Sequence, residues 1–168
     1  NMEGEGRIDI RELIRTALRM RPDRVIVGEV RSAETIDMLQ AMNTGHDGSL
    51  STIHANSPAD ALLRLENMLN MGANQMSSSL IRRQLASALD LLVQVERDGR
   101  GMRRITAVSE ITADETGRDV IALPFFSFKH AADGAGGQYY RASPREPGFV
   151  EKLKVSGEYD QACEVLGL

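Results

Sequence analysis

The stretch RPDRVIVGEVRSAETIDMLQAMNTGHDGSLSTIHAN, residues 21–56, decides the fold because it holds nearly every residue type able to do chemistry. Its apolar run at 25–27 lies between a Pro-Asp turn former and Gly28, which is typical of a parallel strand buried on both faces. Ligands of open α/β sheets lie beyond the carboxyl ends of the strands. We therefore expect Glu29 to face a ligand there, unpaired, holding magnesium through water or orienting an attacking water.

A simpler alternative is that Glu29 and Arg31 only pair with each other at the strand end. The following residues predict a βαβ unit, with Ser32 as helix N-cap, a helix over 33–43, and a second strand over 48–54. In this arrangement His54 leaves the second strand beside Glu29, whereas His46 lies in the loop that enters it. His54 is therefore the better functional candidate, since a lone histidine is more often an ordinary loop residue.

The segments LRMRPDRVIVGEVRSAE (18–34) and MLQAMNTGHDGSLSTIHAN (38–56) carry a family resemblance, which continues through 61–68 and 81–94. They resemble the Walker B and histidine boxes of the secretion ATPase superfamily of type II and type IV secretion systems and type IV pili. Within that superfamily the sequence is most similar to the CpaF-like branch, the motors of tight-adherence (Flp) pili.

The resemblance implies a RecA-like motor, usually a hexameric ring, that hydrolyses ATP with Mg²⁺ at subunit interfaces to drive pilus assembly or protein export. Glu29 matches the Walker B glutamate that polarises water, and Gly28 stands where many other ATPases have an aspartate. His46 and His54 match the histidine box, and the family likeness places His54 near the terminal phosphate. Arg31 matches by position and has a less defined role at the nucleotide.

No G-x-x-x-x-G-K-[ST] segment, the loop that holds nucleotide phosphates, occurs in the 168 residues, and the family's acidic box is also missing. We therefore expect the chain to be the later part of a longer protein and to be inactive in ATP hydrolysis by itself. The alternatives are a non-catalytic ring subunit or adaptor of the secretion machinery and, more remotely, another magnesium-dependent hydrolase.

The amino-acid composition limits which binding partners and which cellular compartment the sequence is consistent with. A net charge of −4 argues against nucleic-acid binding, which usually shows as a basic domain. No apolar run approaches the roughly 18–20 residues that span a bilayer, so membrane contact would come through partners such as an inner-membrane platform protein. The single cysteine, Cys163, fits a reducing cytoplasm. We expect a cytoplasmic protein, peripheral at the inner membrane.

Several arginines are candidates for an anionic partner. Arg11, Arg15 and Arg19 recur every fourth residue on a helix that Asp9 and Glu12 begin as a capping box. Like charges at this spacing are unfavourable by about 0.2–0.5 kcal/mol per pair unless an anion faces them. The anion would be a neighbouring subunit or a nucleotide phosphate, with a solvated face as the ordinary alternative. The candidates of this kind are Arg19, Arg21, Arg82 and Arg83.

The remaining chain predicts helices after Ser57 and over 78–90, then strands over 91–97, 102–112 and 118–126 as an antiparallel meander. Residues 133–138, DGAGGQ, are typical of a linker or hairpin tip. The sequence thus predicts an α/β fold: a RecA-like P-loop NTPase core fragment with a parallel βαβ unit and helices, an antiparallel meander and a short C-terminal tail. We expect the ATPase part to cover residues 1–128 and a tail with short helices to cover 129–168.

Overall fold

A computed structural model describes residues 8–72, 76–131 and 136–166 of the chain. The chain forms two compact units, one of residues 1–89 with 113–121 and the other of residues 90–112 with 122–168. Compactness alone does not show that a unit folds independently. The domain boundary expected after residue 128 therefore stays a prediction.

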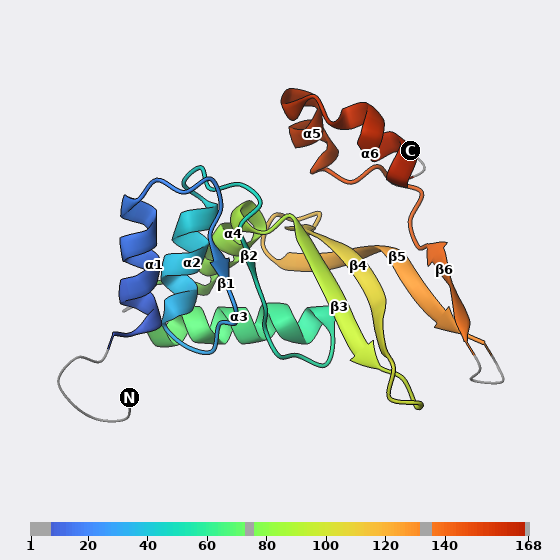
Figure 1. The fold of residues 1–168 in the computed structure, drawn as a ribbon, viewed down its shortest axis with the longest axis horizontal. Coiled ribbons are helices and arrows are strands. Elements are labelled where there is room, and N and C mark those ends of the chain that lie inside the picture. The colour runs from blue at the N-terminus through green and yellow to red at the C-terminus, as the bar shows by residue number, and fades with distance from the viewer. Residues whose placement is uncertain (1–7, 73–75, 132–135, 167–168) are drawn as a thin grey trace. The chain divides into compact units, whose positions relative to one another are not determined.

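The first unit contains the predicted βαβ arrangement (Figure 1). Helix α1 (Ile10–Arg19) precedes strand β1 (Ile26–Val27), helix α2 (Glu34–Met42) and strand β2 (Leu50–Ser51). The two strands pair in parallel, with Ile26 opposite Leu50 and Val27 opposite Ser51. Helices α3 (Pro58–Gly72) and α4 (Ser78–Ala88) follow and pack with α2. The parallel pairing means that both strands finish at the same edge, as the sequence predicts.

The core of this unit lies between the helices. Most of its buried apolar side chains come from α2, α3 and α4, among them Met38, Leu39, Ala41, Ala61, Leu62, Met68, Leu69, Ile81 and Leu85. On α1 only Ile14 is buried, whereas Ile10 and Leu13 are 44% and 54% exposed. The helix predicted for this segment is therefore confirmed, but the described residues leave most of its apolar stripe exposed.

The expectation of a first strand buried on both faces is wrong for this chain. Val25 and Val27 are buried, but Ile26 is 73% exposed and its partner Leu50 is 60% exposed. Alternate side chains of a strand point to opposite faces. In the described part of the chain, the helices therefore cover only one face of this short sheet.

The second unit is built on a sheet of order β3-β4-β5-β6, formed by Leu91–Arg97, Arg103–Ala113, Val120–His130 and Gly137–Arg141. The outer pairs β3–β4 and β5–β6 are antiparallel. The first three strands confirm the predicted meander, whereas β6 was missed. Of the predicted hairpin tip, residues 137 and 138 belong to β6, in which Gly137 pairs with His130, and 133–135 lie outside the described residues.

Two short helices, α5 (Val150–Ser156) and α6 (Tyr159–Leu166), form the expected helical tail of the second unit. Val150 is fully buried, and the Phe125 and Phe149 rings lie 5.9 Å apart. The tail is thus packed on the unit's own sheet. None of the helices within the described ranges is both long enough and apolar enough to cross a membrane.

Candidate functional site

The site is built where β1 and β2 finish. Beyond the last paired residues, the Val30 N–H donates to the Thr52 carbonyl at 3.0 Å, and the Thr52 hydroxyl donates to the Gly28 carbonyl. These bonds continue the parallel pairing past the strands themselves. They bring Glu29 and His54, which leave the two strands, to the same edge.

At this edge the Glu29 carboxylate has two cationic or potentially cationic neighbours. Its Oε1 lies 2.6 Å from Nη2 of Arg31, and its Oε2 lies 3.3 Å from Nε2 of His54. The Glu29 side chain is one-third exposed, whereas Arg31 and His54 are 68% and 77% exposed. The carboxylate is therefore held at the bottom of a small polar site whose other members reach into solvent.

The two carboxylate oxygens are not equivalent. Oε2 is inaccessible to solvent and accepts no well-aligned hydrogen bond, because the His54 contact has the distance of an ion pair without the geometry of a hydrogen bond. Buried acceptors in native proteins normally have a donor or an ordered water. Oε2 of Glu29 therefore lacks a donor, and it can accept from a water molecule or face a hydrated cation once the side chains around it move, for example when the exposed His54 ring turns away.

The expectation that Glu29 is unpaired is wrong, because the alternative pairing with Arg31 is present in the structure. The Arg31 hydrogen bond is the main reason that the pKa of Glu29 lies below its ordinary value, with partial burial opposing it and the charge of His54 adding to it. The carboxylate is thus ionised at neutral pH. Pairing and a site role are compatible, since Arg31 binds Oε1 and Oε2 accepts no hydrogen bond.

The structure does not bring His46 to this edge. His46 Nδ1 lies 3.2 Å from the Ala41 carbonyl at the end of α2, and the His46 carbonyl accepts from Ser49 just before β2. His46 therefore lies at the N-terminal end of β2, whereas Glu29 and His54 lie beyond the C-terminal ends. Its assignment to a nucleotide stays a prediction.

The candidate arginines divide into paired and unpaired side chains. Arg82 lies 3.2 Å from Glu66 and 3.6 Å from Asp119, which gives it a structural role within the first unit. Arg19, Arg21 and Arg83 are exposed, and none of their side chains makes an ion pair with another residue in the described ranges. Their proposed contacts with phosphate or a neighbouring subunit stay predictions.

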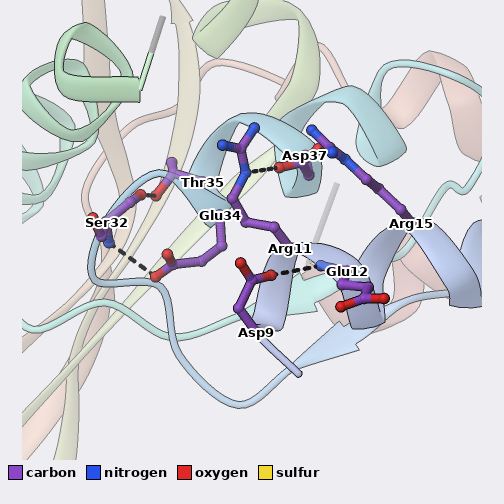
Figure 2. A network of polar contacts seen from close by, with 8 residues as sticks. All are labelled: Asp9, Arg11, Glu12, Arg15, Ser32, Glu34, Thr35 and Asp37. Carbon is purple, nitrogen blue, oxygen red and sulfur yellow. Dashed lines mark hydrogen bonds and ion pairs between the residues drawn. The ribbon is translucent and has the colours of Figure 1, made fainter. Parts of the chain in front are cut away.

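Two acidic residues of α2 that the sequence analysis did not single out form a network of polar contacts (Figure 2). Asp37 on α2 accepts from Nε of Arg11 at 2.6 Å and from Nε of Arg15 at 2.8 Å. This carboxylate is the anion that faces two of the repeated arginines of α1, Arg11 and Arg15. Asp37 falls in the first turns of its helix, where acids are generally favourable, and that was the available signal.

Glu34 is the second missed residue, and it replaces the expected cap. Ser32 is not the N-cap of α2; Ala33 occupies that position and makes no side-chain cap bond. Instead, Oε1 of Glu34 accepts the backbone N–H groups of Arg31 at 2.5 Å and Ser32 at 2.9 Å. The loop that carries Arg31 is thus tied to the start of α2.

The residues present fit a magnesium ion only in a limited way. The described ranges contain no group of three or more His, Cys, Asp or Glu side chains able to hold a metal. Mg²⁺ commonly keeps several waters and binds through one or two carboxylates together with substrate phosphates. A single ionised carboxylate such as Glu29 suits that mode.

Comparison with known proteins places the chain in a family. The family model of Type II/IV secretion system proteins matches residues 1–118, and the chain belongs to this family. A putative conjugal transfer protein of Mycobacterium tuberculosis is 44% identical over 115 residues, which are 68% of this chain and 32% of that protein. The conjugal transfer protein TrbB of Rhizobium radiobacter is 41% identical over 104 residues, 62% of this chain and 31% of the relative.

A solved structure agrees with the sequence comparisons. The VirB11 ATPase of the Brucella suis type IV secretion system, in complex with sulphate, matches with a TM-score of 0.57 and 31% identity. The match covers 61% of this chain and 32% of the VirB11 chain. The α/β fold expected from the sequence is thereby confirmed, and the chain spans about a third of the length of these relatives.

Proposed function

We propose that the full-length protein is an ATP-hydrolysing motor of a type IV secretion or conjugation system, assembled as a hexameric ring. The observation that carries this proposal is the meeting of Glu29 and His54 beyond two parallel strands, where one buried carboxylate oxygen accepts no hydrogen bond. Membership of the secretion family and the likeness to a VirB11 ATPase support it. The phosphate-binding loop that hydrolysis requires is not among the 168 residues, so the activity is proposed for the longer protein.

In the proposed mechanism Glu29 orients the attacking water through Oε2. Its lowered pKa keeps it ionised, so it acts mainly by accepting a hydrogen bond and stabilising positive charge. His54, at 3.3 Å and largely exposed, is able to turn towards the terminal phosphate. Mg²⁺, when bound with the nucleotide, would neutralise phosphate charge, and Glu29 is the residue that would face its water shell. A Cβ added at Gly28 would meet nothing within 4 Å, so Gly28 borders open space.

The specialised role within the family is a narrower proposal. The relatives named above are conjugal transfer and type IV secretion proteins, which favours that branch. A role in Flp pilus assembly rests only on the likeness of residues 18–56 to the CpaF-like motors. In either case we propose a cytoplasmic ring that docks on an inner-membrane platform protein.

One observation favours a second candidate, a non-catalytic ring subunit or adaptor. The Glu29 carboxylate is already occupied on one side by Arg31 at 2.6 Å, an arrangement that a purely structural ion pair also produces. An adaptor would bind partners without turnover.

Glu29→Gln in the full-length protein separates the two candidates. The variant removes the charge that orients water, so ATP turnover is expected to fall by about 10²- to 10⁴-fold while nucleotide binding is retained. Glu12→Gln is the matched control, because Glu12 is an exposed glutamate on α1 away from the strand ends. Wild-type turnover in Glu29→Gln removes Glu29 from the mechanism, and a wild-type ring that binds but never hydrolyses ATP supports the adaptor.

A further inference from the structure

The backbone of the loop between β1 and α2 is fixed by two buried side chains, of which Glu34 makes the larger number of bonds. Glu34 is 9% exposed, and its Oε1 accepts the N–H groups of both Arg31 and Ser32. From the same turn the Thr35 hydroxyl donates to the Ser32 carbonyl at 2.8 Å. Figure 2 shows Ser32 held from the two neighbouring side chains Glu34 and Thr35. The loop therefore has little freedom at the point where Arg31 leaves it.

The fixed loop continues directly into the candidate site. The peptide group whose N–H is held by Glu34 is that of Arg31, and the Arg31 guanidinium lies 2.6 Å from Glu29. We propose that Glu34 is a positioning residue for hydrolysis: by holding the Arg31 backbone, it sets where the Arg31 guanidinium meets the Glu29 carboxylate. This inference rests on the proposed function for its effect on turnover, but its effect on Glu29 does not.

The charges around Glu34 and Glu29 agree with this role. Burial raises the pKa of Glu34, but the backbone N–H groups of Arg31, Glu34 and Ser32 outweigh it, with the charge of Arg11 contributing. Glu34 is thus an anion that accepts from the loop. The charged or titratable groups facing Glu29 are Arg31 and His54, and Arg31 makes the larger contribution to its lowered pKa. Displacing Arg31 should therefore raise the pKa of Glu29.

Oε1 of Glu34 accepts both backbone hydrogen bonds from the loop. Substitutions that keep, remove or withdraw this oxygen therefore test its role selectively. Glu34→Gln keeps an acceptor oxygen in the same place, whereas Glu34→Ala removes it and Glu34→Asp withdraws it by one methylene. Loss of an outer residue that orients a functional group commonly costs about 10- to 100-fold in activity. We expect Glu34→Ala and Glu34→Asp to lower kcat for ATP by about this factor, and Glu34→Gln to recover most of it.

Asp37→Asn is the matched control, because Asp37 is an equally buried acid on the same helix whose partners are Arg11 and Arg15. It should lower stability without changing Glu29. The decisive measurement is the pKa of Glu29, followed by carboxyl-carbon NMR against pH in full-length protein without nucleotide. This pKa, and the acid limb of the turnover profile, should rise in Glu34→Ala and Glu34→Asp but not in Glu34→Gln or Asp37→Asn.

The results separate this inference from the proposed function. If the full-length protein shows no ATP turnover but the pKa of Glu29 still rises in Glu34→Asp, the positioning role of Glu34 is retained and the proposed motor function is rejected. If the protein hydrolyses ATP but neither Glu34→Ala nor Glu34→Asp changes kcat or the pKa of Glu29, the positioning role of Glu34 is rejected. If Glu34→Ala does not fold, Glu34→Asp against Glu34→Gln decides the question, and equal behaviour of those two variants rejects it.

Discussion

The imidazole Nε2 of His54 lies 3.3 Å from Oε2 of Glu29, and the two residues come from different strands of the same parallel pair. Neither residue is near the other in sequence, so the contact depends on the parallel crossover and on the Val30–Thr52 hydrogen bond beyond it. The His54 ring is 77% exposed, which leaves it free to face a ligand. Of the contacts in the candidate site, the one between Glu29 and His54 depends most directly on the fold.

Replacing His54 by Gln in the full-length protein should lower ATP turnover by about 10²-fold, in the range usual for a positioned group that contacts the reacting phosphate. Unfolding should change little, because the side chain is exposed. Turnover and thermal unfolding measured on the same preparations test both statements. His130→Gln, on strand β5 of the second unit, is the control. Equal turnover in the His54→Gln and wild-type proteins would contradict the role.

The Asp37 carboxylate and its two arginine partners on α1 form an arrangement that we call the Asp37 clamp. Replacing Asp37 is expected to change the stability of the fold and not ATP hydrolysis. The Asp37 side chain is 5% exposed and accepts charged hydrogen bonds from Arg11 and Arg15, which are 34% and 60% exposed. Asp37→Asn weakens both bonds at once. We expect the free energy of unfolding to fall by about 1–3 kcal/mol at pH 7, a range that allows for solvent screening of the exposed guanidinium groups.

The same clamp has a defined pH dependence. Burial raises the pKa of Asp37, but hydrogen bonds and charge from Arg11 and Arg15 lower it below 3.8 overall. A carboxylate with a depressed native pKa stabilises the fold above its unfolded pKa, and this contribution is lost as pH falls through the native value. The stability difference between wild type and Asp37→Asn should thus be full at pH 7 and shrink on acidification below about pH 4. Urea unfolding across this range, with exposed Asp60→Asn as control, measures it.

The sequence predicted the elements that local pattern determines. The 3.6-residue period marked the helices, and a branched aliphatic run ending in Gly28 marked the strand that delivers Glu29. Parallel pairing then placed His54 at the same edge without further information. Glu34 and Asp37 were missed because their partners are a backbone loop and another helix, which spacing along one helix does not reveal. Strand β6 was missed because Gly137 is typical of a turn.

Gly72 has a packing role that the sequence pattern does not show. It is the last residue of α3, where a Cβ atom would lie 2.8 Å from Cδ1 of Ile36 and 3.1 Å from Cα of Ala33. The start of α2 approaches α3 so closely that an added Cβ would require these neighbours to shift. We expect Gly72→Ala to lower the free energy of unfolding by about 1–3 kcal/mol, since overpacking forces backbone shifts.

Gly99→Ala is the matched control for this prediction, because its added Cβ would meet nothing within 4 Å. Its effect should stay within about 0.5 kcal/mol, as for most surface changes. Denaturant unfolding of both variants gives the comparison. A Gly72→Ala protein as stable as Gly99→Ala would mean that the Ile36 side chain moves aside at no cost, and that the close helix contact is not a constraint.

The C-terminal helices depend on one carboxylate in the second unit. Glu110 on β4 has a side chain only 10% exposed; its Oε1 accepts the Gly148 N–H, and its Oε2 lies 3.5 Å from Nη2 of Arg145. A Cβ on Gly148 would lie 2.9 Å from the same Oε1. The segment before α5 is therefore fastened to the sheet by a charge-assisted bond for which Gly148 leaves the space.

Glu110→Ala should release this segment, because the Gly148 N–H loses its partner at a cost of about 1–3 kcal/mol. Local opening exposes backbone to protease in proportion to its population. Trypsin should therefore cut after Arg145 about 10-fold faster or more in the variant, as read by mass spectrometry of early digests. Glu115→Ala, at an exposed glutamate in the turn between β4 and β5, should be cut at the wild-type rate. Equal rates for Glu110→Ala and Glu115→Ala would show that Val150 and Phe149 hold the tail without the carboxylate.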